Sequence, residues 1–108
     1  MSTCQENVRN WKEFKLIITD PPSYSGHFEL IKKELVPFVE KNGIRRFWVT
    51  NYFGQQWDYI LFRIEIDERE LVLTKNFLEE LVTQKKIVRW DQPIDWNPKD
   101  DASARYKY

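Results

Sequence analysis

The chain has 108 residues, of which 42% are hydrophobic and 31% are charged. This length fits one domain, and this composition excludes both a disordered tail and a membrane protein. The 17 basic residues equal the 17 acidic ones in number. A dedicated duplex-DNA binder carries a basic excess, because phosphate contacts supply most of its affinity, so that class is disfavoured.

Aromatic residues are the unusual part of the composition. Five Trp, five Tyr and seven Phe make up 16% of the chain. So many large rings are hard to bury in the core of one small domain. We therefore expect some of them to cover a surface that a partner occupies.

The chain has a single cysteine, Cys4, which excludes an internal disulfide and a cysteine-based zinc site within one chain. A reducing, cytoplasmic setting is the simplest interpretation. No apolar run reaches about 18 residues, the length of a membrane span, and the start lacks the apolar stretch of a signal peptide. We expect no metal and no cofactor.

Alternation of apolar and polar residues predicts the strands. Residues 11–20, 44–53 and 57–66 show this alternation, and 87–90 is expected to be a short last strand. The pattern is clearest in the third strand, where one face carries Ile60, Phe62, Ile64 and Ile66. Residues 54–56 would join the second and third strands as a hairpin.

A first helix is predicted over roughly residues 25–42, where apolar residues recur at helical spacing. Gly43 follows it and is typical of a helix C-cap. Pro37 either kinks this helix or begins a second short helix as its first residue. The sequence favours neither of these two possibilities.

A second helix is predicted to follow Asp67, because Asp67 and Glu70 have the spacing of a capping box. This helix would end near residue 86. A start at Thr74 is the alternative, in which case residues 71–73 would be extended.

The expected order is strand, helix, strand, strand, helix, strand. This order predicts an α+β fold, a ferredoxin-like βαββαβ sandwich with a four-stranded antiparallel sheet and both helices on one face. Residues 11–90 would form this single domain, with the first and third strands in the centre of the sheet. Residues 1–10 are expected to be a flexible N-terminus, and 91–108 an irregular C-terminal tail.

Strand parity decides which side chains the helices leave uncovered. With Ile60 toward the helices, Phe47, Val49 and Phe53 of the preceding strand suit the core. The residues of opposite parity form the open face of the sheet. On this face the candidate partner-binding residues are Lys15, Arg46, Trp48, Tyr52, Trp57, Tyr59 and Arg63.

Self-association through the open face is the leading interpretation of these residues. Two-fold homodimers are the commonest oligomers, and protein interfaces are enriched in aromatic residues and arginine. This predicts a non-catalytic binding or regulatory module that forms a homodimer. The chain's own tail, with Trp96, Tyr106 and Tyr108, is an alternative cover for the same face.

Single-stranded nucleic-acid binding on the open face is the first alternative function. Bases stack on aromatic rings for about 1–3 kcal/mol each, while Arg and Lys meet phosphates. The predicted architecture resembles that of the RNA-recognition motif, which uses an open sheet in this way. Residues 60–66 depart from that family, because they do not supply its RNP1 pattern of a basic residue, glycine and interleaved aromatics.

A small peptide-modifying or ligand-converting enzyme is the second alternative, with its site near residues 20–27. Ser23, Ser25 and His27 lie there, where the free N–H groups of a helix N-terminus can hold an anion. His27 is the only histidine, and we expect it to be a half-exposed polar residue rather than a catalytic base. No cluster of His, Cys and carboxylate residues has the spacing of a metal site.

One further family pattern involves several short segments of the chain. The residues in question are Trp11, Phe14, Lys15, Leu16, Leu35, Val36, Pro37, Arg46, Phe47, Trp48, Tyr59 to Arg63, Arg105 and Tyr106. Their order is similar to that in the carboxy-terminal domain of lantibiotic dehydratases. The resemblance implies a peptide substrate and an elimination or cyclisation step. This chain is much shorter, and Asp58 stands where that family's histidine is expected, so the resemblance assigns no catalytic residue.

Overall fold

The computed structural model describes residues 8–19, 27–53 and 57–99. In chain order its elements are β1 (Asn10–Thr19), α1 (His27–Leu30), a π-helical segment (Ile31–Leu35), α2 (Val36–Lys41), β2 (Phe47–Phe53), β3 (Asp58–Ile66), α3 (Glu68–Thr83), β4 (Arg89–Trp90) and β5 (Ile94–Asp95). The protein therefore has an α+β fold, as the sequence predicts.

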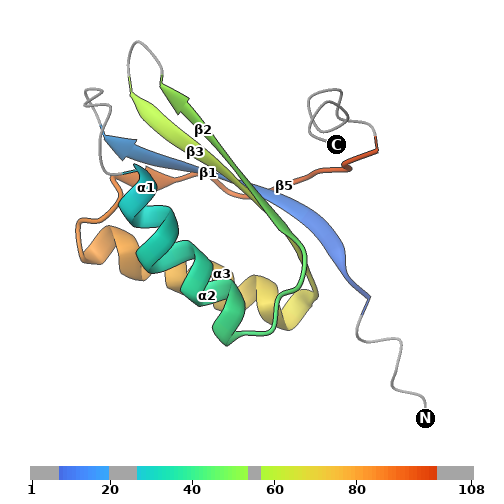
Figure 1. Cartoon of the computed structure of the whole chain (residues 1–108). Helices are drawn as coiled ribbons and strands as arrows, with labels where there is room; N and C mark the ends of the chain where they lie inside the picture. Colours follow the sequence, from blue (N-terminus) through green and yellow to red (C-terminus); the bar gives the residue numbers. More distant parts are fainter. Residues whose placement is uncertain (1–7, 20–26, 54–56, 100–108) are drawn as a thin grey trace.

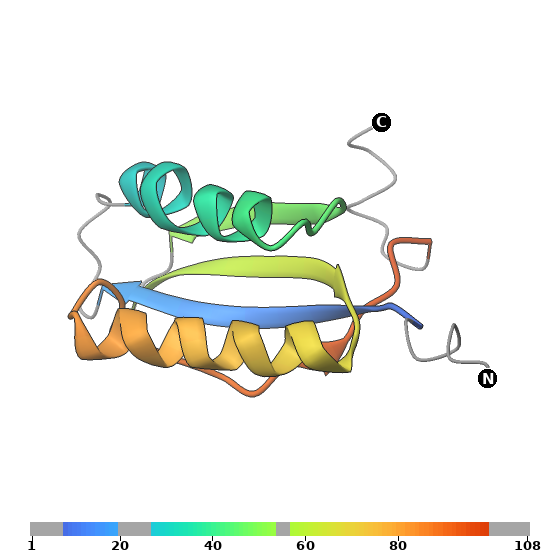
Figure 2. The ribbon, with the colours of Figure 1, turned by 90° about the horizontal axis from the view of Figure 1, so that it is seen from below.

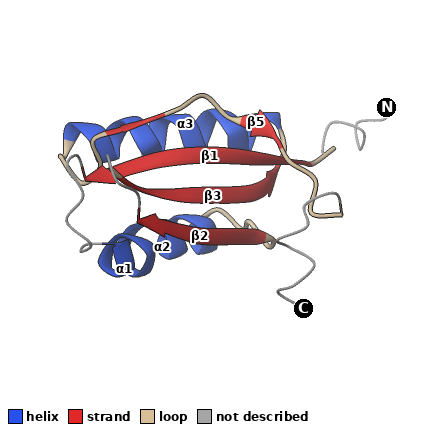
Figure 3. Cartoon of the chain, turned by 90° about the horizontal axis from the view of Figure 1, so that it is seen from above, coloured by secondary structure: helices blue, strands red, loops and turns tan. Residues whose placement is uncertain are grey.

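The strands form one sheet in the order β2-β3-β1-β4, and β5 also pairs with β1. Every one of these pairings is antiparallel. The two central strands are β1 and β3, the first and third in the chain. Figures 1 and 2 show the helices together on one side of the sheet. The other side is the open face, from which the molecule is seen in Figure 3.

The core lies between the sheet and the helices, and it confirms the parity predicted for the third strand. Its strand residues are Phe14, Leu16, Ile18, Ile60, Phe62, Ile64 and Ile66, all of them buried. The π-helical segment contributes Leu35, α2 contributes Val39, and α3 contributes Leu78 and Leu81. Burying one such side chain contributes about 1.5–3 kcal/mol, so alternation on β3 strongly fixes its register.

One residue of the second strand, Phe47, is less buried than predicted. Phe47 was expected to be buried, but it is 37% exposed. It is the first residue of β2, which is an edge strand of the sheet, so neighbouring elements cover its side chain incompletely. Val49 packs against the core as expected, and the side chain of Phe53 lies outside the described part of the chain.

The first helical run extends from His27 to Lys41, and Pro37 is the second residue of α2, not its first. A π-helical segment precedes α2, and the backbone N–H of Val36 bonds to the carbonyl of Ile31, five residues back. Proline cannot donate a backbone hydrogen bond, and its ring crowds the carbonyl four residues earlier. The wider π turn accommodates this crowding just before Pro37.

Gly43 ends the first helical run and also explains why β2 begins late. Its φ of +68° is a left-handed conformation, which glycine adopts without a Cβ penalty. The N–H of Ile44 then bonds to the carbonyl of Val39 at 2.9 Å. Ile44 is therefore a buried part of the helix cap, whereas the sequence pattern placed it at the start of the strand.

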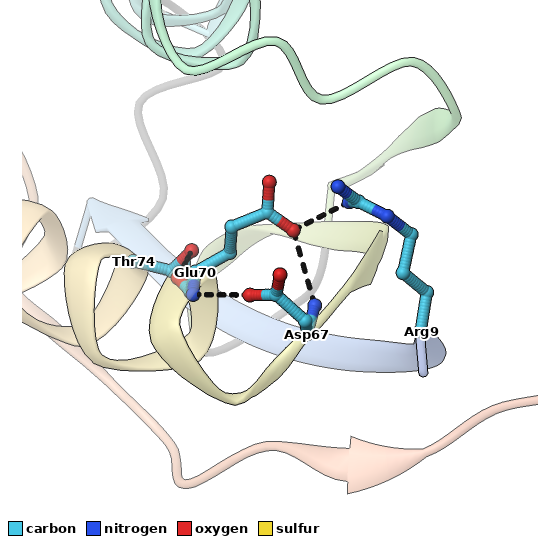
Figure 4. A network of polar contacts seen from close by, with 4 residues as sticks. All are labelled: Arg9, Asp67, Glu70 and Thr74. Atoms are coloured by element: carbon cyan, nitrogen blue, oxygen red, sulfur yellow. Dashed lines mark hydrogen bonds and ion pairs between the residues drawn. The ribbon is translucent and has the colours of Figure 1, made fainter. Parts of the chain in front are cut away.

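The capping box at the start of α3 is confirmed, so this helix begins directly after Asp67 and not at Thr74. Figure 4 shows the Asp67 side chain accepting from the N–H of Glu70, while the Glu70 side chain accepts from the N–H of Asp67. Arg9 also pairs with the Glu70 carboxylate. The helix ends at Thr83, earlier than residue 86, because the backbone turns left-handed at Lys85.

The last part of the chain is more ordered than the sequence suggests. The predicted strand over residues 87–90 is shorter than expected, since only Arg89 and Trp90 pair with β1. The segment placed in an irregular tail contains β5, which pairs with β1 at Lys12 and Glu13. The sheet consequently has five strands rather than four.

Candidate functional site

The open face is built from alternate residues of the three long strands. The antiparallel register sets Trp48 beside Arg63, and Arg63 beside Glu13. Further along, Tyr52 lies beside Tyr59. Side chains directly opposite one another on antiparallel strands are close enough to interact. Residues far apart in sequence therefore meet in rows across this face.

One end of the open face carries a cluster of three indole rings and two guanidinium groups. The Trp96 ring lies 5.1 Å from the Trp11 ring in an edge-to-face arrangement and 6.5 Å from the Trp48 ring, between centroids. The guanidinium of Arg63 lies 4.6 Å from the centre of the Trp96 ring. Arg46 lies 5.7 Å from the centre of the Trp11 ring. Electrostatic attraction to the ring faces favours both cation positions.

The opposite end of the open face repeats this combination of rings and cations. Tyr52 and Tyr59 are stacked, with ring centroids 4.9 Å apart and planes 11° apart. The Lys15 ammonium lies 4.4 Å from the centre of the Tyr59 ring and 6.0 Å from that of Trp57. Arg89 lies 5.1 Å from the centre of the same Trp57 ring.

A groove of about 540 Å³ opens at the first end of the face. It is lined by Trp11, Arg45, Arg46, Phe47, Trp48, Pro98 and Lys99. Three of these residues are cations, three are aromatic and none is acidic. Such a lining suits a ligand that has both flat apolar parts and negative charge.

Two carboxylates on the open face lie beside its arginines. The Arg63 Nε donates to Glu13 Oε2 at 2.7 Å, and Arg63 is 5% exposed. Such a buried guanidinium requires a charge partner, which Glu13 supplies. Arg46 Nη1 lies 3.5 Å from Glu65 Oε2, and its side chain is 63% exposed. Arg46 therefore presents its charge to solvent, whereas Arg63 is held in place within the face.

The structure places the seven residues that parity assigned to the open face in two groups at its opposite ends: Arg46, Trp48 and Arg63 at one end, and Lys15, Tyr52, Trp57 and Tyr59 at the other. To that face it adds Trp11, Arg89 and Trp96, while Arg45, Phe47, Pro98 and Lys99 line the groove at its first end. Trp11 lies four residues before Lys15 on β1, so its side chain points to the same face. Continuing the alternation toward the start of this strand would have predicted Trp11 on the open face. Trp96 lies on this face, in agreement with the alternative that the chain's own tail covers it, because the segment after β4 crosses the sheet there. Tyr106 and Tyr108 lie outside the described residues.

A second polar cluster surrounds His27, at the end of the sheet where α1 begins. His27 Nε2 lies 3.5 Å from Asp58 Oδ2, and its Nδ1 lies 3.3 Å from Asn51 Oδ1. Thr19 Oγ1 donates to Asp58 Oδ2 at 3.1 Å. A bulge between Ile17 and Thr19 shifts the register of β1 against β3 at this point.

This cluster corrects the expectation that His27 is half exposed. His27 is 4% exposed and Asp58 is fully buried, because α1 packs its first residue against the sheet end. Each ring nitrogen of His27 lies within 3.5 Å of a side-chain oxygen atom of a strand residue. Ser23 and Ser25 of the predicted anion site lie outside the described residues.

Within residues 8–19, 27–53 and 57–99, no three His, Cys, Asp or Glu side chains are close enough together to hold a metal ion. None of the helices described there has the length and apolar character needed to span a membrane. Comparisons with models of known protein families, with characterised proteins and with solved structures gave no match. A function must therefore be argued from the chain's own residues.

Proposed function

We propose that this protein is a non-catalytic binding module that takes single-stranded nucleic acid on its open face. The observation that carries the proposal is the groove of about 540 Å³ to which the sheet side contributes two indole rings, Trp11 and Trp48, and two cations, Arg45 and Arg46. Stacking of each base on a ring contributes about 1–3 kcal/mol, and the cations meet phosphates. The sheet order β2-β3-β1-β4, with the helices on one side, supports a ferredoxin-like arrangement of these four strands.

The zero net charge of the chain is compatible with this proposal because binding depends on local charge. Arg45, Arg46 and Lys99 line the groove, and none of its lining residues is acidic. If Arg45 and Arg46 contact phosphates, the logarithm of the binding constant should fall with the logarithm of salt concentration with a slope of about −1.4, at about 0.7 per phosphate on a single strand.

The test is fluorescence polarisation with a labelled single-stranded oligonucleotide of about ten nucleotides, within the usual site size of small domains. We expect Arg46→Ala to weaken binding by about five- to tenfold, since one phosphate contact is lost. Arg69→Ala is the matched control, because Arg69 is an exposed arginine on α3, on the far side of the sheet. Trp48→Ala should weaken binding by about tenfold or more through lost stacking.

Phe28→Ala is the control for the aromatic substitution, since Phe28 is 74% exposed on α1. Equal losses for Arg46→Ala and Arg69→Ala would contradict a site on the open face. Absence of binding at micromolar protein would contradict nucleic-acid binding altogether.

Self-association is a second candidate, which one observation favours. The tail segment pairs with β1 at Lys12 and Glu13, at the end of the face that holds Trp48. The other end carries the stacked pair Tyr52 and Tyr59, aromatic rings of the kind in which protein interfaces are enriched. Sedimentation equilibrium separates the two functions: a dimer mass that Tyr59→Asp reduces to that of a monomer would support self-association.

A further inference from the structure

The candidate binding surface is already occupied in part by the chain itself. We define the strap as residues 94–99, which include β5. The strap begins beside β1, where Ile94 and Asp95 pair with Glu13 and Lys12, and it reaches β2, where Pro98 and Lys99 line the groove. Figure 3 shows β5 alongside β1 at the end of the sheet that this segment crosses.

The backbone of the strap is attached to the sheet by few interactions. β5 has only two residues, and the N–H of Trp96 bonds to the carbonyl of Trp11 at 3.3 Å. Ile94 is 59% exposed. Asp95, which forms an ion pair with Lys12, is 87% exposed, and pairs with a solvated partner contribute little to stability. Opening the strap would therefore break far fewer contacts than unfolding the domain.

Trp96 is the residue that holds the strap against the open face. Its ring lies edge-on to Trp11, beside Trp48, with the Arg63 guanidinium over it. Aromatic rings and a guanidinium are also the groups that hold an unstacked base. A base that packs against Trp11 and Trp48 would need the space that the Trp96 ring fills.

We propose that the strap is an autoinhibitory element in which Trp96 occupies the place of a base and must leave before a nucleic acid binds at this end of the face. The inference rests on the proposed function. A site that is open only part of the time binds its ligand more weakly, in proportion to the open fraction. The closed strap would thus lower affinity and favour ligands able to displace it.

A disulfide that locks the strap tests this proposal. Lys12 and Asp95 are direct partners in an antiparallel pair, where Cα atoms lie about 4.5–5.5 Å apart, within the range that a disulfide spans. The variant combines Lys12→Cys and Asp95→Cys with Cys4→Ser, so that only the engineered pair can form. The same protein after reduction is its control, and Trp96→Ala in the Cys4→Ser background is the opened form.

We expect oxidation to weaken binding of the labelled oligonucleotide by about fivefold or more, and Trp96→Ala to tighten it by about as much. Equal affinity of the oxidised and reduced forms, or weaker binding by Trp96→Ala, would overturn the autoinhibitory role while leaving the proposed function intact. Absence of binding by every form, including Trp96→Ala, would overturn the proposed function and this inference together. Circular dichroism of each form establishes that it is folded.

Discussion

At the scale of single residues, the buried ion pair on the open face differs from the exposed pairs on the helices. Arg63 and Glu13 have side chains that are 6% and 14% exposed, whereas Glu29 and Lys33 of an exposed helical pair are 62% and 69% exposed. Removal of one partner of a buried pair leaves the other charge buried and unpaired, which is costly. A charge left by removing one partner of an exposed pair is solvated by water.

Substitution of Glu13 should therefore destabilise the fold far more than substitution of Glu29. We expect Glu13→Ala to lower the free energy of unfolding by about 1.5–3 kcal/mol, the range for hydrogen bonds to charged groups. Glu29→Ala is the matched control and should cost about 0.5 kcal/mol or less, as for other pairs four residues apart on a helix. Urea denaturation followed by circular dichroism measures both. Similar losses for the two variants would show that the Arg63 charge is not held as described.

At the scale of elements, the ends of the helices are set by local chemistry that the sequence displays. The capping box of Asp67 and Glu70 begins α3 as predicted, and Gly43 ends the first helical run with a positive φ. Within 4 Å of a Cβ built at Gly43 there is no described atom outside its own neighbours in the chain. The cost of a side chain there is therefore a cost of backbone conformation alone.

Gly43→Ala isolates this backbone cost. It should lower the free energy of unfolding by about 1–2 kcal/mol, the penalty of an L-residue in the left-handed region. Gly43→Asn should cost less than Gly43→Ala, because asparagine tolerates that region. The midpoints of urea unfolding for the three proteins give the comparison. An alanine variant as stable as the asparagine variant would contradict a left-handed helix end at residue 43.

Three features of the strands differ from the prediction because each depends on contacts outside its own local sequence. Ile44 continues the apolar alternation of β2, but a hydrogen bond to Val39 makes it part of the helix cap instead. Phe47 has core parity, yet parity does not say how much of an edge strand is covered. β5 has two exposed residues and no periodicity of its own. Its position comes from pairing with β1, a long-range contact that no local pattern encodes.

At the scale of the whole molecule, the helices and the open face have different roles. The helices cover the apolar residues of the sheet and so fix which side chains face away from them. The seven residues predicted for the open face lie on one side of the sheet because alternation on the strands is strict and one face is buried. The positions of Trp96 and Lys99 could not be predicted in this way, since they depend on the path of the strap.

The five tryptophans of the chain provide a direct test of where a ligand binds. Trp11, Trp48, Trp57 and Trp96 lie on the open face. Trp90 lies on the helix side, where its ring packs beside Phe14 and its indole N–H donates to Glu79 of α3. The indole N–H signals of these residues in a ¹⁵N-labelled protein therefore report separately on the two sides of the sheet.

Titration of this labelled protein with a single-stranded oligonucleotide is the most direct test of binding on the open face. We expect the indole signals of Trp11, Trp48 and Trp96 to shift in proportion to binding, while the Trp90 signal stays in place. A shift of the Trp90 signal with those three unchanged would place the ligand on the other side of the sheet and contradict a binding site on the open face.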